Sequence, residues 1–253
     1  MPKFAVITGA SSGIGAEFAR QLSARGYNLL LVARRADRLE KLSDQLTTVC
    51  EIFTADLSKK SECLRLVKAL EGRRVDLFIN NAGFGACGAF SETDVGKELS
   101  MLRVNVLAMH RLFKFTLRKM EAQGFGTILN VASSAGLLPG GPYMAGYYAS
   151  KAYVVSLTRG VARELQELHS PVYVCALCPG PVDTEFNDRA GVVFALKGIT
   201  PEFCVQEAMH GMMHRRIIIV PSAFMRACTT AQKLLPASLL MPIVARQQKK
   251  KLG

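Results

Sequence analysis

The sequence of 253 residues has no internal repeat, no low-complexity stretch and no Ser/Pro-rich linker. Because nothing divides it, we expect one domain over residues 1–253, a length that α/β folds occupy as a single unit. Its seven cysteines are scattered and odd in number, and no signal peptide is visible at the N-terminus. These absences predict a protein of the reducing cytoplasm.

Acidic residues are missing from the last part of the chain. No Asp or Glu follows Glu207, whereas eight Lys or Arg residues do, against a net charge of +12. Residues 221–253 therefore form a basic, apolar C-terminal extension. This pattern is typical of an amphipathic segment in peripheral contact with anionic lipid, interrupted by Pro236 and Pro242 and too short to span a bilayer. The alternative is a terminal helix packed on its own chain or on a partner subunit.

Two other kinds of site are disfavoured. The basic residues are not interleaved with stacking aromatic residues, and no nucleic-acid motif occurs, so we expect no nucleic-acid partner. His210 and His214 share a helical face, but no Glu lies between them and no third ligand is evident. A surface pair is the better interpretation, and no metal site is predicted.

Apolar runs and helical patterns alternate along the chain. The strand-like runs span residues 3–8, 27–33, 49–54, 75–80, 126–132, 172–177 and 216–220. Helical patterns separate most of them, at residues 36–46, 61–70, 94–120 and 147–168. The alternation predicts a doubly wound α/β fold with a parallel sheet covered on both faces. An active site is then expected at the carboxyl ends of the strands.

Glycines concentrate at the end of the first apolar run, in the segment Gly9-Ala-Ser-Ser-Gly13-Ile-Gly15. Glycine lets the backbone turn sharply and approach a pyrophosphate, and the helix expected next offers free amides at its N-terminus. The segment therefore predicts a dinucleotide site, although its GxxxGxG spacing differs from the usual GxGxxG and such turns also occur without a ligand.

Tyr147 and Lys151 lie four residues apart in the sequence YYASK, and would share a face of a helix. An ammonium about 5 Å from a phenol favours the phenolate by roughly 3 kcal/mol at an effective dielectric of about 20. The Tyr pKa is then expected to fall by about two units. The pair is a candidate proton donor, and Tyr148, three residues before Lys151, is an alternative to Tyr147.

Further motifs follow the expected strands: Asn80-Asn81-Ala82-Gly83, Val131-Ala-Ser-Ser134-Ala-Gly136, and Cys178-Pro179-Gly180-Pro181-Val-Asp-Thr184. With TGASSGIG, Asp56-Leu57, Asn105 and YYASK, this order resembles the short-chain dehydrogenase/reductase family from Lys3 to about Val220. The resemblance implies a Rossmann-type three-layer sandwich with a mostly or wholly parallel sheet of about seven strands. It also implies a homodimer or homotetramer, and hydride transfer between a nicotinamide and a carbonyl or alcohol.

The resemblance gives each catalytic residue a role. Tyr147 would donate the proton, and Lys151 would hold the nicotinamide ribose and lower the Tyr pKa. Ser134 would hydrogen-bond the carbonyl oxygen, because the family interval of thirteen residues pairs it with Tyr147. Asn105 would help to hold a water that connects Lys151 to solvent. The residues expected to bind the cofactor are Gly9, Ser11, Ser12, Gly13, Ile14, Gly15, Arg34, Arg35, Asp56, Leu57, Asn81, Ala82, Gly83, Tyr147, Lys151, Pro179, Gly180, Val182 and Thr184.

No carboxylate stands at the end of the second strand, where enzymes that use NAD place one roughly 20 residues after the glycine motif. This chain has Ala33, Arg34 and Arg35 there. A small residue followed by a guanidinium leaves space and a bidentate partner for a 2′-phosphate, so NADP(H) is the expected cofactor. The alternative is that both arginines are merely solvated and that Asp37 reaches the ribose.

Apolar residues mark the loops expected around the substrate. One set follows Pro181, where family members have a mobile lid: Phe186, Val192, Val193, Phe194 and Leu196. Another occupies the loops at other strand ends: Phe84, Leu137, Leu138, Tyr143 and Met144. They favour a hydrophobic ketone, aldehyde or 3-oxoacyl-like substrate. The alternative is a catalytically idle NADP(H)-binding sensor or scaffold. The presence of all four catalytic residue types argues against it.

Overall fold

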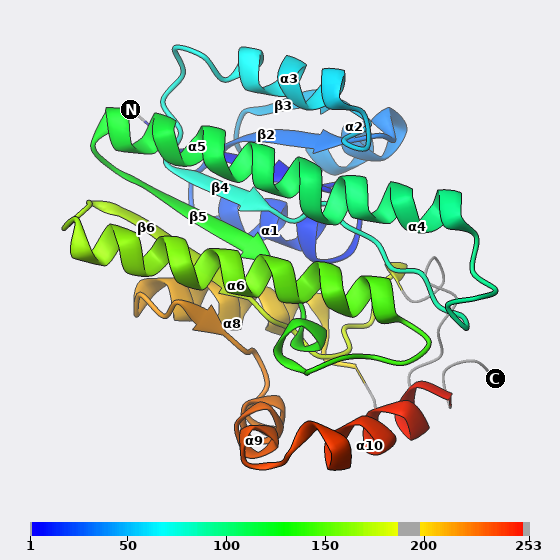
Figure 1. Cartoon of the computed structure of the whole chain (residues 1–253). Coiled ribbons are helices and arrows are strands. Elements are labelled where there is room, and N and C mark those ends of the chain that lie inside the picture. Colours follow the sequence, from blue (N-terminus) through cyan, green and yellow to red (C-terminus); the bar gives the residue numbers. More distant parts are fainter. Residues whose placement is uncertain (1, 187–197, 250–253) are drawn as a thin grey trace.

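A parallel sheet of seven strands forms the centre of the molecule in the computed structural model, which describes residues 2–186 and 198–249 (Figure 1). The strands are β1 (Phe4–Thr8), β2 (Asn28–Ala33), β3 (Cys50–Thr54), β4 (Leu77–Asn80), β5 (Gly126–Val131), β6 (Val172–Leu177) and β7 (Ile218–Ile219). Their order is β3-β2-β1-β4-β5-β6-β7, and every neighbouring pair is parallel. The prediction of a doubly wound, wholly parallel sheet is confirmed.

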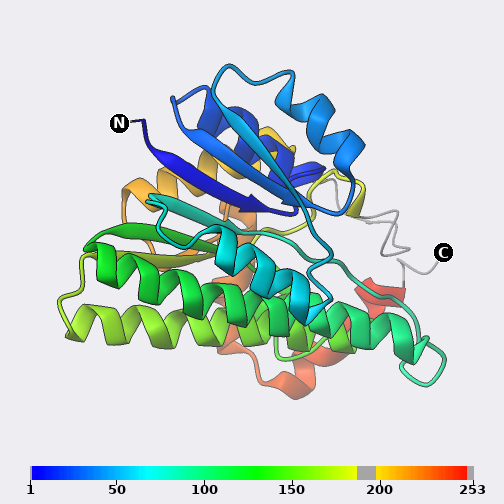
Figure 2. The ribbon, with the colours of Figure 1, turned by 90° about the horizontal axis from the view of Figure 1, so that it is seen from above.

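Helices cover both faces of the sheet, as seen from above in Figure 2. One face packs against α1 (Gly13–Ser23), α2 (Ala36–Ser43) and α8 (Pro201–Met213). The other packs against α3 (Lys60–Ala69), α5 (Met109–Gln123) and α6 (Ala145–Glu167). Because side chains alternate along a strand, β1 sends Val6 into one core and Ala5 and Ile7 into the other. Strands buried on both faces explain why their sequences read as continuous apolar runs.

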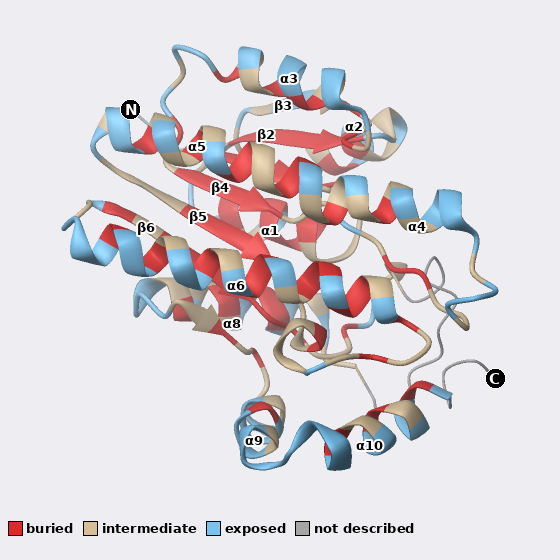
Figure 3. Cartoon of the chain, in the orientation of Figure 1, coloured by how far each residue is buried: buried red, intermediate tan, exposed pale blue. Residues whose placement is uncertain are grey.

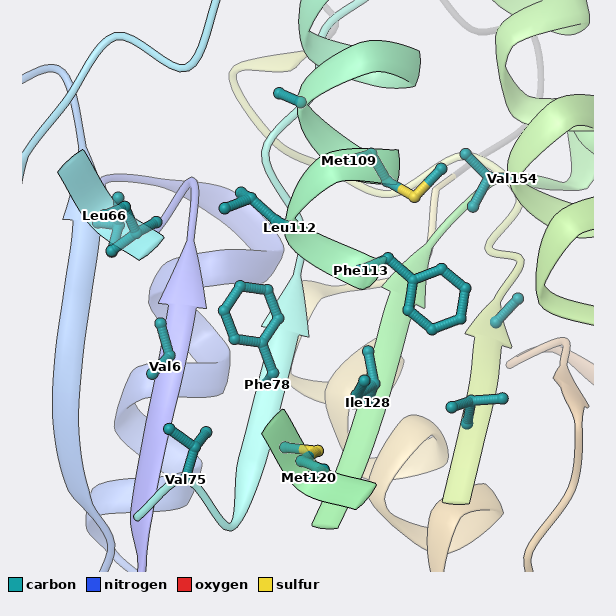
Figure 4. Close-up of a cluster of buried hydrophobic side chains, with 14 of the residues drawn as sticks. Val6, Leu66, Val75, Phe78, Met109, Leu112, Phe113, Met120, Ile128 and Val154 are labelled. Atoms are coloured by element: carbon teal, nitrogen blue, oxygen red, sulfur yellow. The ribbon is translucent and has the colours of Figure 1, made fainter. Parts of the chain in front are cut away.

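Figure 4 shows the core beneath α3, α5 and α6. Phe78 of β4 and Ile128 of β5 are fully buried there, and Leu112 of α5 packs against the same cluster. Figure 3 shows the same arrangement as buried central strands and helices with exposed outer faces. Burying a side chain such as Phe78 contributes about 1.5–3 kcal/mol to the free energy of unfolding. The sheet is therefore a stable base for the loops at its edge.

The helix expected over residues 94–120 is not uniform. It consists of α4 (Val95–Leu102), a π-helical segment η1 (Arg103–Ala108) and α5. Asp94 caps α4 by accepting a hydrogen bond from the Lys97 amide at 2.6 Å. The π-helical segment contains Asn105, and such segments are frequent at functional sites. Hydrophobic periodicity does not reveal this change in winding, because the extra residue shifts the apolar pattern by less than a turn.

The C-terminal extension forms α9 (Ala223–Ala231), the short turn η3 (Gln232–Leu234) and α10 (Ala237–Lys249), which lie outside the sheet and its covering helices (Figure 1). Leu240 and Val244 of α10 are buried in a cluster with Met144, Tyr147 and Tyr148. The extension therefore packs on its own chain through one face. Within residues 2–186 and 198–249, no helix has the length and apolarity needed to cross a membrane.

Candidate active site

A cavity of about 540 Å³ lies at the carboxyl ends of the strands. The loops that follow β1, β2, β3, β4, β5 and β6 all contribute to its wall, as the parallel topology predicts. Of the residues expected to bind the cofactor, all except Gly15 line this cavity. Three of the expected catalytic residues, Ser134, Tyr147 and Lys151, line it as well, and Asn105 lies behind the wall.

The glycine loop forms one end of the cavity. Gly9 and Gly13 have φ angles of +68° and +55°, a conformation that side chains other than glycine rarely adopt. Gly15 does not line the cavity because it packs helix α1 against the loop, and a Cβ there would lie 2.3 Å from the Gly9 carbonyl oxygen. The Asn81 side chain fixes the loop from β4 by donating hydrogen bonds to the carbonyls of Thr8 at 2.9 Å and Gly9 at 3.2 Å.

Arg35 lies beside the glycine loop and beside a carboxylate. Its guanidinium donates to the hydroxyls of Ser11 at 3.1 Å and Ser12 at 3.2 Å, and it forms an ion pair with Glu185 at 3.3 Å. Arg38 pairs with the same carboxylate, and these two guanidinium groups lower the pKa of Glu185. Asp37 is exposed and is not part of the cavity wall. This corner of the cavity therefore already binds an anionic group.

Asp56 follows β3 in the same wall. Burial opposes ionisation of its carboxyl group, but hydrogen bonds from the Ser58 hydroxyl at 2.8 Å and amide at 3.1 Å outweigh it and lower the Asp56 pKa, with help from Arg34 and Lys59. Leu57, the next residue, is buried against the core. Asp56 is thus an ionised acceptor at the edge of the cavity.

Tyr147 and Lys151 project from the first turns of α6 and are both buried. The Lys151 ammonium lies 5.8 Å from the centroid of the Tyr147 ring and donates to the Val131 carbonyl at 3.0 Å. A Cβ on Gly83 would lie 3.3 Å from the Lys151 ammonium and 2.9 Å from the Asn105 Oδ1. The absence of a side chain at Gly83 therefore lets Lys151 and Asn105 both pack against the backbone of this residue.

The structure corrects the expected shift in the Tyr147 pKa. Burial raises the pKa of Tyr147 to about 12, against a smaller lowering by a hydrogen bond with the Ser133 side chain. Burial also lowers the pKa of Lys151 to about 8. The attraction between ammonium and phenolate lowers the Tyr pKa, but the free-energy cost of removing both groups from water acts against it and is larger here. Tyr147 is therefore protonated at neutral pH and suited to donate a proton.

Two adjacent serines, Ser133 and Ser134, line the cavity near Tyr147, and the choice between them stays a prediction. Ser133 lies close enough to Tyr147 to lower the Tyr147 pKa, and Ser134 lines the same cavity. Ser133 precedes the 3₁₀ turn η2 (Ser134–Leu137) with an extended backbone, and its hydroxyl accepts from the Ala135 amide at 3.1 Å. It stands fourteen residues before Tyr147, one more than the family interval.

Asn105 is buried, and its side chain is tied to the loop after β4. It donates to the Phe84 carbonyl at 2.9 Å and to the Ser150 hydroxyl at 3.1 Å, and accepts from the Phe84 amide at 3.1 Å. These bonds join the π-helical segment, the loop after β4 and α6. Asn105 thus positions the cavity wall next to Lys151.

Apolar side chains surround the cavity beside Tyr147: Phe84, Leu138, Met144, Tyr148, Phe186 and Met225. The Phe186 ring lies 5.6 Å from the Tyr147 ring. Leu137 and Tyr143, which were expected to belong to this set, are not part of the cavity wall. Val192, Val193, Phe194 and Leu196 lie outside the described residues.

Sequence reasoning missed the residues that the C-terminal extension adds to the cavity, Met225, Gln247 and Gln248. Leu240, Val244 and Gln248 recur at intervals of four and are the buried residues of α10. This interval was a signal for a helix face packed on the chain. In the described part of the chain, no three His, Cys, Asp or Glu residues are grouped closely enough to hold a metal ion.

Comparison with known proteins agrees with the geometry of the cavity. Residues 3–191 match the family model described as short chain dehydrogenase. An uncharacterized oxidoreductase of Staphylococcus epidermidis is 33% identical over 74% of this chain and 80% of its own. The very-long-chain 3-oxoacyl-CoA reductase of Anas platyrhynchos is 27% identical over 97% of this chain and 80% of its own.

Solved structures show the same fold with nucleotides bound. A short-chain dehydrogenase from Sphingobium yanoikuyae in complex with NADPH is 31% identical, with a TM-score of 0.83 over 94% of this chain and 95% of its own. A short chain dehydrogenase/reductase from Burkholderia phymatum in complex with NAD is 27% identical, with a TM-score of 0.84 over 95% of each chain. The chain therefore belongs to the short-chain dehydrogenase family, as an oxidoreductase with a site for a nicotinamide cofactor.

Proposed function

We propose that the protein is an NADP(H)-dependent oxidoreductase that interconverts an apolar carbonyl compound and its alcohol. The observation that carries the proposal is the placement of Tyr147, with Ser133 and Lys151 beside it, in a cavity that also contains the glycine loop. A Cβ at Gly9 would meet Asn81 and Ala82 at 2.8–2.9 Å, so only glycine lets the loop after β1 pack this closely on the loop after β4.

Each catalytic residue acts on the carbonyl oxygen or on the residue beside it. A bound nicotinamide supplies the hydride for the carbonyl carbon, and negative charge then develops on the carbonyl oxygen. Ser133, in place of Ser134, donates a hydrogen bond to this oxygen, and Tyr147 gives it a proton. Lys151 holds the ribose and favours the phenolate left on Tyr147. Asn105 keeps the loop and α6 in place and helps to hold a water that returns a proton through Lys151.

Three arginines near the end of β2 support NADP(H) over NAD(H). Arg34 lines the cavity at the end of β2, and Arg35 together with Arg38 binds the Glu185 carboxylate there. A 2′-phosphate carries more charge than a carboxylate and accepts the same bidentate bonds from guanidinium groups. The exposed Asp37 does not occupy the place of the ribose-binding carboxylate.

The test is a screen of aldehydes, ketones and 3-oxoacyl thioesters for NADPH consumption. Relatives called a very-long-chain 3-oxoacyl-CoA reductase and a D-beta-hydroxybutyrate dehydrogenase give reason to include acyl compounds. We expect turnover of an apolar ketone or thioester. Binding of NADPH with inactivity on the whole panel would favour the sensor or scaffold instead.

We extend the proposal to partners and location. A homodimer or homotetramer would form through η1, α5 and α6, where Leu107 and Tyr153 are exposed beside His110, Lys114 and Phe115. Peripheral contact with anionic lipid would use the outer face of the C-terminal extension. The protein would act in the cytoplasm or at a membrane facing it.

A further inference from the structure

The wall that α10 adds to the cavity contains one polar side chain with an unused hydrogen-bonding atom. Gln248 is 2% exposed and lines the cavity beside Tyr148. Its Nε2 donates to the Tyr148 hydroxyl, whereas its Oε1 is buried and has no hydrogen-bond partner in the described part of the chain. A buried acceptor without a partner is destabilising, and most such groups in proteins are paired.

The surroundings of Gln248 are apolar. Leu240 and Val244 precede it on the same face of α10, and they are buried in a cluster with Met144 and Tyr148. Phe186 packs against the same cluster. In the described chain, the Oε1 therefore faces no side chain that compensates its burial.

Tyr148 provides a hydrogen-bond donor beside the acceptor of Gln248. Its oxygen accepts the hydrogen bond from Gln248, so its own O–H remains available to donate. Burial raises the Tyr148 pKa, which keeps this proton in place at neutral pH. The two side chains together present one acceptor and one donor next to Tyr147. A hydroxyl or a secondary amide, which both donates and accepts, matches this pair.

We propose that Gln248 and Tyr148 form a polar subsite for a second functional group of the substrate, a hydroxyl or secondary amide carried on the apolar body of the carbonyl compound. This inference rests on the proposed function and adds a specificity-determining contact to it. It also gives the C-terminal extension a role at the site. If Gln248 served only to hold α10 against α6, its amide N–H would be used, but its carbonyl oxygen would have no role.

The test compares 2-alkanones with 2-alkanones of the same length that bear a terminal hydroxyl, over a range of chain lengths. For the wild type, we expect kcat/KM with NADPH to be about tenfold or more higher for the hydroxylated compound at one chain length. Gln248→Met should abolish this preference, since Met is apolar and of similar length. Gln166→Met, an exposed position on α6, should keep the preference.

Calorimetric titration of both compounds into the protein saturated with NADP⁺ makes the test independent of turnover. Equal affinity of the wild type for the two compounds at every chain length would overturn the subsite, as would an undiminished preference in a folded Gln248→Met. If no ketone is reduced but the hydroxylated compound still binds tighter, the proposed function fails and the subsite stands.

Discussion

At the scale of residues, Tyr147 and Tyr148 are adjacent on α6 but have different partners. Tyr147 lies beside Ser133 and Lys151, whereas the Tyr148 hydroxyl accepts a hydrogen bond from Gln248. We expect Tyr147→Phe to lower kcat by at least about 10³-fold, because the proton donor is lost. Tyr148→Phe should retain turnover of a plain ketone. Steady-state kinetics of both variants checks this, and the reverse result would overturn the assignment of the proton donor.

The serine pair permits a similar comparison. Ser133→Ala should lower kcat by about 10²–10³-fold, the usual cost of one hydrogen-bond donor to a developing oxyanion. Ser134→Ala should change kcat much less, because Ser133 is the serine that influences the Tyr147 pKa. Equal losses in both variants, or a larger loss in Ser134→Ala, would restore the assignment made from the sequence interval.

The pH dependence of reduction should follow Lys151. Its pKa is lowered to about 8 by burial, so the side chain is charged below that pH and loses its charge as the pH rises through it. Tyr147, with a pKa raised to about 12, keeps its proton over the same range. We therefore expect kcat/KM for reduction to fall above about pH 8. A pH profile of Lys151→Arg, which stays charged, should lack this fall even if its activity is lower.

At the scale of elements, the loop after β6 and the start of α2 are joined through Glu185. This carboxylate forms ion pairs with Arg35, one of the residues proposed to bind the 2′-phosphate, and with the neighbouring Arg38. Glu185→Gln should tighten NADPH binding by up to about fivefold, since such exposed ion pairs are worth about 0.2–1 kcal/mol, and should leave NADH binding unchanged. Fluorescence titration with both cofactors measures the change. Weaker NADPH binding, or an equal change for NADH, would argue against this phosphate site.

The elements themselves were largely predictable from the sequence. Buried parallel strands read as apolar runs, and the turn from β1 into α1 requires glycines at Gly9 and Gly13. The π-helical segment around Asn105 was not predictable, because a change in winding leaves the apolar periodicity nearly intact. The choice of Ser134 over Ser133 stays a prediction, because it rests only on the family interval of thirteen residues.

At the scale of the whole molecule, the C-terminal extension has two faces. Leu240 and Val244 pack against the cavity wall, whereas Leu239 and Ile243 are 59% and 53% exposed, near Arg246 and Lys249. The sequence could predict the amphipathic character of this segment but not the place where its buried face rests. That place depends on contacts with residues around 144–148, about a hundred positions away in the chain.

The exposed face can be tested without opening the cavity. The double variant Leu239→Ser/Ile243→Ser removes only exposed apolar groups, so we expect it to float less with vesicles that contain anionic lipid and to keep its turnover. Val95→Ser, an exposed apolar position on α4, should float as the wild type does. Equal flotation of all three proteins, or none with the wild type, would contradict a lipid contact through this face.

The central claim is hydride transfer between a nicotinamide and a carbonyl carbon in the cavity that contains Tyr147, Ser133 and Lys151. The most direct measurement uses NADPH deuterated at C4 of the nicotinamide on the transferred face, with an apolar ketone, and mass spectrometry of the product. The account predicts an alcohol with one deuterium on the carbinol carbon for the wild type and no such product for Tyr147→Phe. Unlabelled alcohol, or labelled alcohol formed equally well by Tyr147→Phe, would contradict it.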